Sequence, residues 1–456
     1  MKKKTAGLVG LDKNHVWHPF TQMREWEASD PLVIERGQGS YLIDTEGRRY
    51  LDGVSSLWVN VHGHRKREVD RAIKEQLGRI AHSTLLGLAN VPSIKLAERL
   101  VKAAPKGLTR VFYSDNGSTA VEIALKMAFQ FCEETAKPGK KRFVAFTGAY
   151  HGDTFGSMSV GEIDIFVKKY RPLLFRPFRA PYPYCYRCPI KAKKAFPDCK
   201  TACLKAFEDV LKKHHKEIAA CVIEPILQGA AGVVISPPGF LKEVRRLTKK
   251  YDVLLIADEV ATGFGRTGHM FACDAEKVSP DFLCLAKGLT GGYLPLAATL
   301  TTDRVYKAFL GKYEEYKSFF HGHTYTGNPL GCAAAIASLD VFEKEKVLQK
   351  LAPKVNIFNV LLEKLKGLPH VGDVRRIGLV AGIELVKDKR TKEAYTARER
   401  VGYRACLRAR DYGVILRPLG DVVVIMPPLS ATAREIEKIV DAAYRGIREI
   451  TEGIAQ

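Results

Sequence analysis

Two short apolar runs, each followed by a charged residue, constrain this chain more than any other feature. Residues 253–257 form the first run and precede Asp258, and residues 282–286 form the second and precede Lys287. Apolar runs of this length are typical of strands that are buried on both faces of a parallel sheet. Ligands bind at the carboxyl ends of such strands. An acid at one strand end and an amine at the next therefore predict a ligand site.

Similar runs alternate with helical patterns over the middle of the chain. The further strands that we expect are residues 110–113, 142–146, 221–226 and 296–302. This alternation predicts an α/β fold with a doubly wound, mostly parallel sheet. From about residue 345 the pattern changes to charged amphipathic helices and a few strands. We expect a large α/β domain over 65–335 and a second, smaller α+β domain over 336–456, to which the N-terminal segment 1–64 contributes.

The charge balance is basic, with 72 Lys and Arg against 50 Asp and Glu and a net charge of +22. The excess is scattered as short basic pairs, which is typical of solvated faces and favours anionic substrates only modestly. A nucleic-acid-binding or pyridoxal-sensing regulator would need a helix-turn-helix or an ordered basic patch, and neither is visible. No apolar run reaches the roughly 20 residues that span a bilayer, and the first residues do not form a secretory signal. We therefore expect a cytoplasmic protein with no membrane or nucleic-acid partner.

Residues 263–268 read GFGRTG and fit the G-x-G-x-x-G pattern of dinucleotide-binding loops. The context does not fit, because no helix pattern opens after the glycines and no acid follows at about 20 residues. The sequence context therefore argues against a dehydrogenase.

Pyridoxal phosphate explains Asp258 and Lys287 together. A lysine between apolar and glycine residues can form a Schiff base with a carbonyl cofactor. This cofactor also needs a carboxylate for its ring nitrogen, an aromatic ring to stack on and a phosphate cradle. Asp258, Tyr150 and the start of a helix pattern at residues 117–119 can supply these, each after a predicted strand. Taken alone, residues 117–119 also fit a plain helix start capped by Ser118 or Thr119.

Dispersed motifs then resemble a known family. Residues 148–152 (GAYHG), residues 258–268 (DEVATGFGRTG) and the segment around Lys287 resemble the class III, fold-type I pyridoxal phosphate aminotransferases. More narrowly, the chain is similar to the 8-amino-7-oxononanoate aminotransferases of biotin synthesis. The likeness runs from residues 17–21 (WHPFT) through 52–56 (DGVSS) to 417–418 and 426–428 (MPP), which is nearly the whole chain.

The resemblance implies a role for each matching residue. Lys287 would attach the cofactor and move a proton, Asp258 would pair with the pyridine nitrogen, and Tyr150 would stack on the ring. The implied phosphate-binding residues are Gly117 and Ser118, joined by His323 and Thr324 from the partner subunit of a homodimer with shared active sites. The implied substrate-binding residues are Phe20, Leu57, Trp58, Tyr150, Arg266, Gly322 and Arg417. Arg417 would hold the carboxylate of the keto acid, a bidentate task suited to guanidinium.

The implied reaction is amino transfer to 8-amino-7-oxononanoate, giving 7,8-diaminononanoate, with S-adenosylmethionine or lysine as amino donor. Family members that use S-adenosylmethionine typically carry Tyr, Trp and Pro where this chain has Phe20, Leu57 and His323. These differences slightly favour lysine as the amino donor, and both donors remain alternatives. Another class III ω-amino acid aminotransferase with a different substrate would share the cofactor residues.

Four cysteines lie close together in the sequence, at positions 185, 188, 199 and 203. The spacing C-x2-C, a gap of ten residues and C-x3-C could hold a structural zinc ion. The family's catalysis needs no metal, and we assign none. Reduced thiols and a labile disulfide are the alternatives to a metal.

Overall fold

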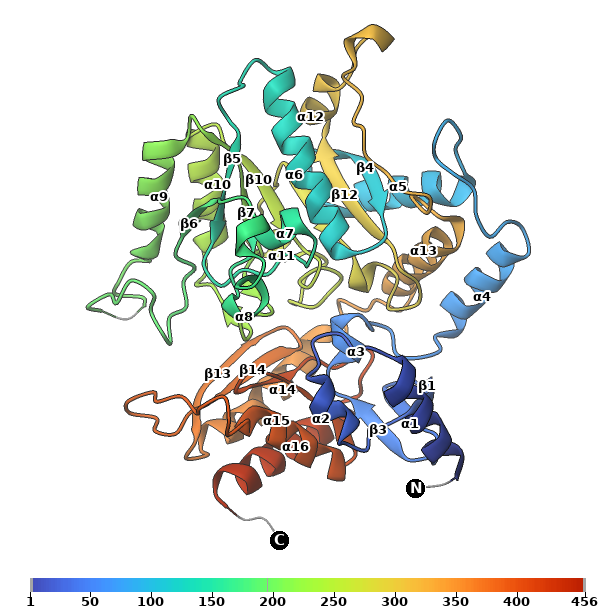
Figure 1. Ribbon diagram of the computed structural model, residues 1–456, viewed down its shortest axis with the longest axis vertical. Helices are drawn as coiled ribbons and strands as arrows, with labels where there is room; N and C mark the ends of the chain where they lie inside the picture. The colour runs from blue at the N-terminus through green and yellow to red at the C-terminus, as the bar shows by residue number, and fades with distance from the viewer. Residues whose placement is uncertain (1–2, 195, 454–456) are drawn as a thin grey trace.

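A seven-stranded sheet forms the centre of the computed structural model, which describes residues 3–194 and 196–453 (Figure 1). The strand order is β4-β12-β11-β10-β7-β5-β6. These strands are β4 (Leu108–Ser114), β5 (Arg142–Phe146), β6 (Phe178–Ala180), β7 (Ile218–Ile223), β10 (Leu254–Asp258), β11 (Phe282–Leu285) and β12 (Ala297–Thr302). The strands from β11 to β6 run parallel, so the sheet is mostly parallel as the sequence predicts.

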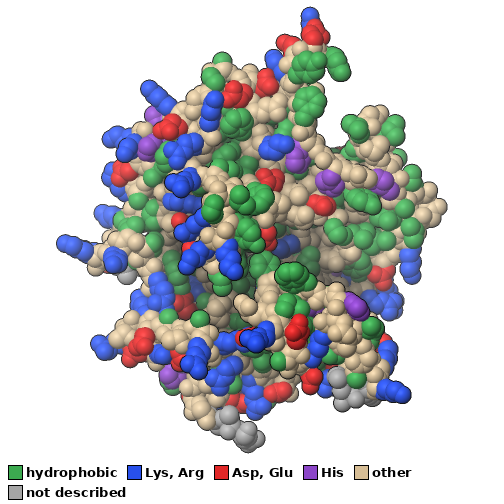
Figure 2. All heavy atoms as spheres, viewed as in Figure 1, with side chains coloured by type: hydrophobic (Ala, Val, Ile, Leu, Met, Phe, Trp, Pro, Cys, Tyr) green, Lys and Arg blue, Asp and Glu red, His purple; other side chains and the backbone are tan. Residues whose placement is uncertain are grey.

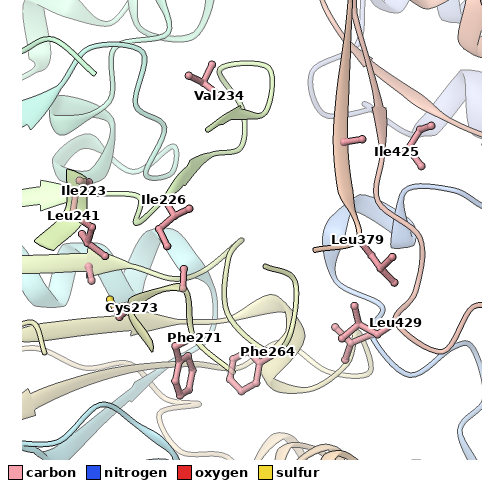
Figure 3. Packing of buried hydrophobic residues seen from close by; sticks show 14 of the residues in the cluster. Ile223, Ile226, Val234, Leu241, Phe264, Phe271, Cys273, Leu379, Ile425 and Leu429 are labelled. Atoms are coloured by element: carbon pink, nitrogen blue, oxygen red, sulfur yellow. The ribbon is translucent and has the colours of Figure 1, made fainter. Parts of the chain in front are cut away.

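Strand β10 shows why apolar runs form the middle of this sheet. Leu255 and Ala257 pack into the apolar cluster that contains α10 (Phe240–Lys250), whereas Leu254 and Ile256 pack into the cluster that contains α6 (Gly117–Glu134). Successive side chains of a strand point to opposite faces. Both faces of β10 are therefore covered, and Figure 3 shows part of the larger cluster around it.

Strand β12 is antiparallel to both β11 and β4, which agrees with a sheet that is mostly rather than wholly parallel. One expectation about this sheet needs correction. The run at 221–226 was expected to be a strand containing Glu224, but β7 ends at Ile223. Glu224 stands in the turn before Pro225, where its carboxylate can bond to loop amides rather than interrupt the strand ladder.

Two smaller sheets lie together below the large one in Figure 1. One has the order β13-β14-β17-β16 and is antiparallel throughout; the other has the order β1-β2-β3-β15. Their strands are β1 (Ile34–Gln38), β2 (Tyr41–Asp44), β3 (Arg49–Asp52), β13 (Val371–Ile377), β14 (Val380–Leu385), β15 (Val414–Ile415), β16 (Arg417–Leu419) and β17 (Val422–Ile425). Because β15 pairs with β3, strands from the two ends of the chain share a sheet. The domain limits given above stay a prediction.

Helices cover the sheets and connect their strands. The longer ones besides α6 and α10 are α1 (Lys3–His15), α4 (Arg67–Leu77), α5 (Val91–Ala103), α9 (Cys203–His214), α13 (Pro329–Lys344), α14 (Leu351–Lys366), α15 (Val401–Asp411) and α16 (Ala433–Thr451). The short helices are α2 (Met23–Glu27), α3 (Ser55–Trp58), α7 (Phe155–Val160), α8 (Asp164–Val167), α11 (Ala272–Ala275) and α12 (Asp303–Ala308). Short 3-10 turns span Arg171–Leu173, Lys287–Leu289 and Tyr313–Glu315, and a hairpin joins β8 (Leu227–Gln228) to β9 (Val234–Ile235).

The surface shows how the basic residues are distributed. In the view of Figure 2, Lys and Arg side chains are spread over both the upper and the lower part of the molecule, with acidic side chains among them. Of the helices in the described ranges, none is long and apolar enough to cross a membrane.

Candidate active site

A cavity of about 440 Å³ lies where several strands of the large sheet end. We call it the inner cavity. Its walls come from the ends of β7, β10 and β11, from the turn after β5 and from the first turn of α6. The predicted site residues that line it are Trp58, Gly117, Ser118, Tyr150, Asp258 and Lys287. Strand ends far apart in the sequence therefore bring together the acid, the amine and the aromatic ring.

Asp258 is buried and held by two contacts. Its Oδ1 accepts a hydrogen bond from the backbone N–H of Val260 at 3.1 Å, and its Oδ2 lies 2.7 Å from Nδ1 of His151. The imidazole is also buried, and its Nε2 has no hydrogen-bond partner among the residues that the structure describes. His151 was not among the predicted site residues, although its position next to Tyr150 in the GAYHG motif could have indicated it.

Lys287 follows β11 and begins a 3-10 turn with φ of +44°. A non-glycine residue rarely adopts this backbone conformation, and such strain often marks a functional site. Its Nζ lies 5.1 Å from the centre of the Trp58 ring. Burial lowers the pKa of the Lys287 amine, and the charges of Asp258 and Glu224 act in the opposite direction. A lowered pKa leaves more of the amine unprotonated near neutral pH, and the unprotonated amine is the form that acts as nucleophile and base.

Glu224 is a second buried carboxylate in the inner cavity. It accepts hydrogen bonds from the backbone N–H groups of Tyr150 at 3.1 Å and of Gly229 at 2.9 Å. Burial raises the pKa of Glu224 to about 7. These amides are the partners that a buried carboxylate requires, and they also fix the backbone of Tyr150. The Tyr150 hydroxyl donates to Asp153 at 2.8 Å.

The first turn of α6 forms one end of the inner cavity. Asn116 caps this helix by accepting from the N–H of Thr119 at 3.0 Å, so Ser118 and Thr119 are not the caps. The Ser118 hydroxyl instead lies 2.7 Å from that of Thr154. The first N–H groups of a helix have no intrahelical acceptor, and the helix dipole favours an anion there.

Two glycines, one at this helix start and one facing it, allow the backbone segments to approach closely. A Cβ added to Gly152 would lie 2.2 Å from Oγ of Ser118, and one added to Gly117 would lie 2.5 Å from a methyl group of Val260. The backbone of Gly152 also has φ of +127°. The two glycines keep the helix start open and close to the strand ends.

A larger cavity of about 560 Å³ shares Ala230 with the inner cavity, and we call it the outer cavity. Its walls are mostly apolar and include Phe20, whose ring centre lies 5.3 Å from that of Phe166. Arg417, the first residue of β16, lines it. Within the described chain, the Arg417 guanidinium has no ion pair or hydrogen bond. Burial lowers the pKa of Arg417.

Several predicted site residues lie outside both cavity walls. Arg266 is buried and donates to the carbonyl oxygens of Asn60 and Pro427, each at 2.8 Å, and burial lowers its pKa to about 9. Its guanidinium thus holds two segments of backbone together, and a contact with substrate stays a prediction. The others are Leu57, Gly322, His323 and Thr324, of which Leu57, Gly322 and Thr324 are exposed.

Residues 55–58 are strained. All four have positive φ, from +46° to +70°. Asp52 helps to hold them, because its carboxylate accepts from both the N–H and the hydroxyl of Ser56. The segment places Trp58 against Lys287, and sequence patterns give no signal for this geometry.

The four clustered cysteines line a separate cavity of about 200 Å³. All four are free thiols, and no group of three or more His, Cys, Asp or Glu in the described residues is arranged to hold a metal ion.

The fold and the inner cavity together define a pyridoxal phosphate-dependent transferase of fold type I. Comparisons with known proteins agree, and the family model described as "Aminotransferase class-III" matches residues 23–446. The chain belongs to the class III aminotransferase family.

Curated relatives and solved structures cover nearly the whole chain. The adenosylmethionine-8-amino-7-oxononanoate aminotransferase of Geobacter sulfurreducens is 57% identical, over 98% of this chain and 99% of the relative. The crystal structure of the Methanocaldococcus jannaschii protein of that name has a TM-score of 0.93 and 48% identity, and covers 97% of this chain and 99% of its own. An omega transaminase of Pseudomonas jessenii in complex with PMP has a TM-score of 0.93 and 31% identity, with 98% and 99% covered.

The protein is therefore a pyridoxal phosphate-dependent aminotransferase that acts on small molecules. The inner cavity fits this cofactor in size and in chemistry. It combines an anion-binding helix start, a buried carboxylate, an aromatic side chain and an amine with lowered pKa. His151 lies in the same wall, and its buried Nε2 has no hydrogen-bond partner among the described residues. A bound molecule could provide that partner.

Proposed function

We propose that this protein transfers an amino group to 8-amino-7-oxononanoate to form 7,8-diaminononanoate, a step in biotin synthesis, with S-adenosylmethionine or lysine as the donor. The observation that carries this proposal is the 57% identity, over nearly the full length of both chains, to a relative whose name states that activity. The apolar outer cavity with an unpaired guanidinium also suits an acid with a methylene chain.

The proposal assigns cofactor binding to the residues of the inner cavity. Asp258 would bind the ring nitrogen, Tyr150 would stack on the ring, and Gly117 with Ser118 would bind the phosphate. Bound pyridoxal phosphate supplies an electron sink for the carbon that carries the amino group. Lys287 would attach the cofactor and, as a base with lowered pKa, would take a proton from that carbon and return it.

We assign the substrates to the outer cavity and to the passage between the two cavities. Arg417 would bind a substrate carboxylate, because a half-buried guanidinium without a partner is stabilised by one. Trp58, whose ring faces Lys287, would border the reacting carbon. We assign Phe20 and Leu57 to the donor side, and we keep Arg266 and Gly322 as proposed substrate-binding residues.

We further propose a cytoplasmic homodimer that shares its active sites. An apolar groove of about 400 Å³ runs along α6 and is bordered by the segment Ser318–Phe320. The same segment leads to His323 and to exposed Thr324. Covering the groove with a second copy would bury these apolar side chains and bring Thr324 and His323 to the partner's phosphate site.

The decisive experiment follows the two half-reactions through the absorbance of the bound cofactor. The holoenzyme is mixed first with lysine or with S-adenosylmethionine. The enzyme that results from this first half-reaction is then mixed with 8-amino-7-oxononanoate. We expect one donor to change the spectrum and the acceptor to restore it. Lys287→Ala should lose the visible band and about a thousandfold or more of turnover, since general acid–base catalysis alone contributes roughly 10²–10⁴-fold. Exposed Lys242→Ala is the matched control.

Two results would contradict the proposal. Wild-type turnover in Lys287→Ala would remove the proposed role of that residue. Failure of 8-amino-7-oxononanoate to restore the spectrum, while another ω-amino acid or its oxo acid does so, would identify an aminotransferase of the same class with a different substrate.

A further inference from the structure

The four clustered cysteines have no role in the proposed reaction. Three of them lie within residues 181–202, the segment between β6 and α9, and Cys203 is the first residue of α9. We call residues 181–202 the cysteine loop. All four thiols line the cavity of about 200 Å³, which we call the thiol cavity. Cys185 is exposed, Cys188 and Cys199 are half-buried, and Cys203 is buried. One thiol is thus open to solution, and it shares a cavity with the other three.

The first part of the cysteine loop is anchored by hydrogen bonds to distant residues. Nε of Arg187 donates to Oε1 of the buried Glu384 in β14 at 2.6 Å, and its Nη1 donates to the carbonyl oxygen of Lys392 at 2.9 Å. The amine of Lys392 in turn donates to the carbonyl oxygen of Tyr186 at 2.6 Å. These bonds fix the start of the loop, where Cys185 lies.

The second part of the loop, residues 191–202, has no such anchor. It contains no helix or strand among its described residues, and no hydrogen bond or ion pair from them reaches beyond the loop and α9. Its bonds are local, such as that from the N–H of Ala202 to the carbonyl oxygen of Cys199 at 3.1 Å. Figure 1 shows the loop projecting from the molecule below α9. A covalent link across such a segment would restrict it strongly, because little else limits its conformations.

The cysteines stand at the two ends of this segment. Cys185 and Cys188 precede it and form the first pair, whereas Cys199 and Cys203 lie at its end and form the second pair. The two pairs meet across the thiol cavity. A disulfide needs two thiols, whereas a structural metal site needs three or four ligands, and the described residues provide no such arrangement. The geometry therefore favours a disulfide.

Basic side chains surround these thiols. From Cys185 to Cys203 the sequence has one acidic residue, Asp198, and five basic residues, which are Arg187, Lys191, Lys193, Lys194 and Lys200. Lys194 and Lys392 line the thiol cavity itself. Positive charge of this kind attracts an anionic disulfide reagent and stabilises the thiolate that attacks it. Burial raises the pKa of Cys185 and raises that of Cys203 to about 11, so these two thiols exchange slowly when such a reagent is scarce.

We propose that the cysteine loop is a redox modification site, at which Cys185 or Cys188 forms a reversible disulfide with Cys199 or Cys203. The co-reactant is an anionic, low-molecular-weight disulfide. One loop thiolate attacks it and releases one small thiol, and a second loop thiol then displaces the other. Two electrons and two protons pass to the reagent, whose S–S bond breaks as the S–S bond of the loop forms. In a reducing cytoplasm such a link is transient and regulatory rather than permanent.

The link would act on the outer cavity. Tyr184 and Pro189 line both the thiol cavity and the outer cavity. Joining the two pairs ties residues 191–202 to the anchored start of the loop, so this wall has fewer conformations before a substrate binds. A preordered wall loses less entropy on binding, and we expect oxidation to lower the KM of the acceptor by about 2- to 10-fold with kcat nearly unchanged. This consequence rests on the proposed function, whereas the disulfide itself does not.

The test compares holoenzyme treated with glutathione disulfide and holoenzyme treated with dithiothreitol, by mass spectrometry after digestion with trypsin without reduction. Each of the four cysteines falls on a different peptide, because trypsin cuts after Arg187, Lys191, Lys200 and Lys205. We expect the oxidised sample alone to contain a peptide of the first pair linked to a peptide of the second. Six other thiols are buried and should stay free: Cys132, Cys221, Cys273, Cys284, Cys332 and Cys406.

A chain that carries both Cys185→Ser and Cys188→Ser should lose the link and the change in KM, and should match the reduced wild type in turnover. The visible band of its bound cofactor shows that it is folded. A link confined to one pair, or no link in the wild type, would overturn the inference, as would about one zinc ion per chain that blocks oxidation. An unchanged KM in the linked enzyme would contradict the action on the outer cavity. Absence of turnover with 8-amino-7-oxononanoate in both samples would instead contradict the proposed function, and the peptide map would still decide whether the disulfide forms.

Discussion

The Asp258 carboxylate lies in the wall of the inner cavity, the proposed cofactor site, and contacts a buried histidine. Asp258 is the last residue of β10 and His151 lies in the turn after β5, and their side chains meet at 2.7 Å. A carboxylate oriented by a buried donor keeps one oxygen position fixed, which matters when it must bind a protonated ring nitrogen. His151 is therefore a positioning residue that acts through Asp258.

We expect the two residues to contribute unequally. Asp258→Asn should lower kcat by about 100-fold or more, because a charge-assisted hydrogen bond to the cofactor is lost. His151→Asn should lower kcat by about 10-fold and shift the absorbance maximum of the bound cofactor. Steady-state kinetics and a visible spectrum of each holoenzyme measure these effects. An unchanged spectrum in His151→Asn would contradict the positioning role.

Glu224 makes stability depend on pH. Its pKa is about 7 in the folded chain, above the value near 4.5 in the unfolded chain, because burial disfavours the charge. Between these two pKa values the folded chain binds more protons than the unfolded chain. The contribution of Glu224 to the free energy of unfolding is therefore greatest at acidic pH, and it is lost as the pH rises towards 7. The contribution of this group is of order 3 kcal/mol.

Glu224→Gln should flatten this pH dependence, since the amide does not titrate. Melting temperatures measured between about pH 5 and pH 8 test this prediction. The buried Glu224 carboxyl lowers the stability of the wild type only at pH values at which it ionises. Exposed Glu98→Gln serves as the control and should retain the wild-type slope. The same slope in wild type and Glu224→Gln would show that Glu224 does not titrate in this range.

Among single elements, the start of α6 determines where an anion can bind. Asn116 caps the helix, and glycine at positions 117 and 152 allows the strand ends to approach it. The helix start lies in the wall of the inner cavity because it follows β4 directly and because Val260, just after β10, lies against Gly117. The proposed phosphate cradle thus depends on packing between elements rather than on residues 117–119 alone.

Gly152→Ala should weaken binding of pyridoxal phosphate to the apoprotein by about tenfold or more, because the new methyl group would collide with Ser118. Gly107→Ala is a matched control, since Gly107 also has a positive φ, of +97°, but nothing lies within 4 Å of its added Cβ. Both variants should lose about 1–3 kcal/mol of stability from backbone strain. Equal cofactor affinity in the two would contradict the proposed cradle.

At the scale of the whole molecule, the proposed dimer would complete the site. The groove along α6 is apolar, and Phe129, Phe175 and Phe320 in its walls are exposed in the single chain. Exposed apolar surface of this kind marks an interaction site more often than a free surface. A single chain also leaves His323 and Thr324 outside both cavity walls.

Phe320→Asp should shift the protein from dimer to monomer and reduce turnover, because a charge would be buried at the proposed interface. Sedimentation velocity and activity at the same concentrations measure both effects. Val360→Asp, at an exposed position of α14, introduces the same charge elsewhere and should leave the dimer intact. A fully active monomer would contradict the shared active site.

The sequence determined the core of the sheet and the chemistry of the inner cavity. Apolar runs at 142–146, 253–257 and 282–286 correspond to β5, β10 and β11, since runs buried on both faces leave little choice of structure. Asp258 ends β10, and Tyr150 and Lys287 come shortly after β5 and β11, so their convergence could be predicted from the parallel order alone. The motifs were sufficient to identify the family.

Only the tertiary structure decided what depends on contacts between distant segments. The antiparallel course of β12, the His151–Asp258 contact, the positive φ of residues 55–58 and the burial of Arg266 all depend on packing. Local patterns carry no information about such contacts, because the partners lie on other elements. Arg187 shows this most clearly: it is one of many basic residues in the sequence, and Glu384, almost 200 residues away in the chain, fixes it in the wall of the outer cavity.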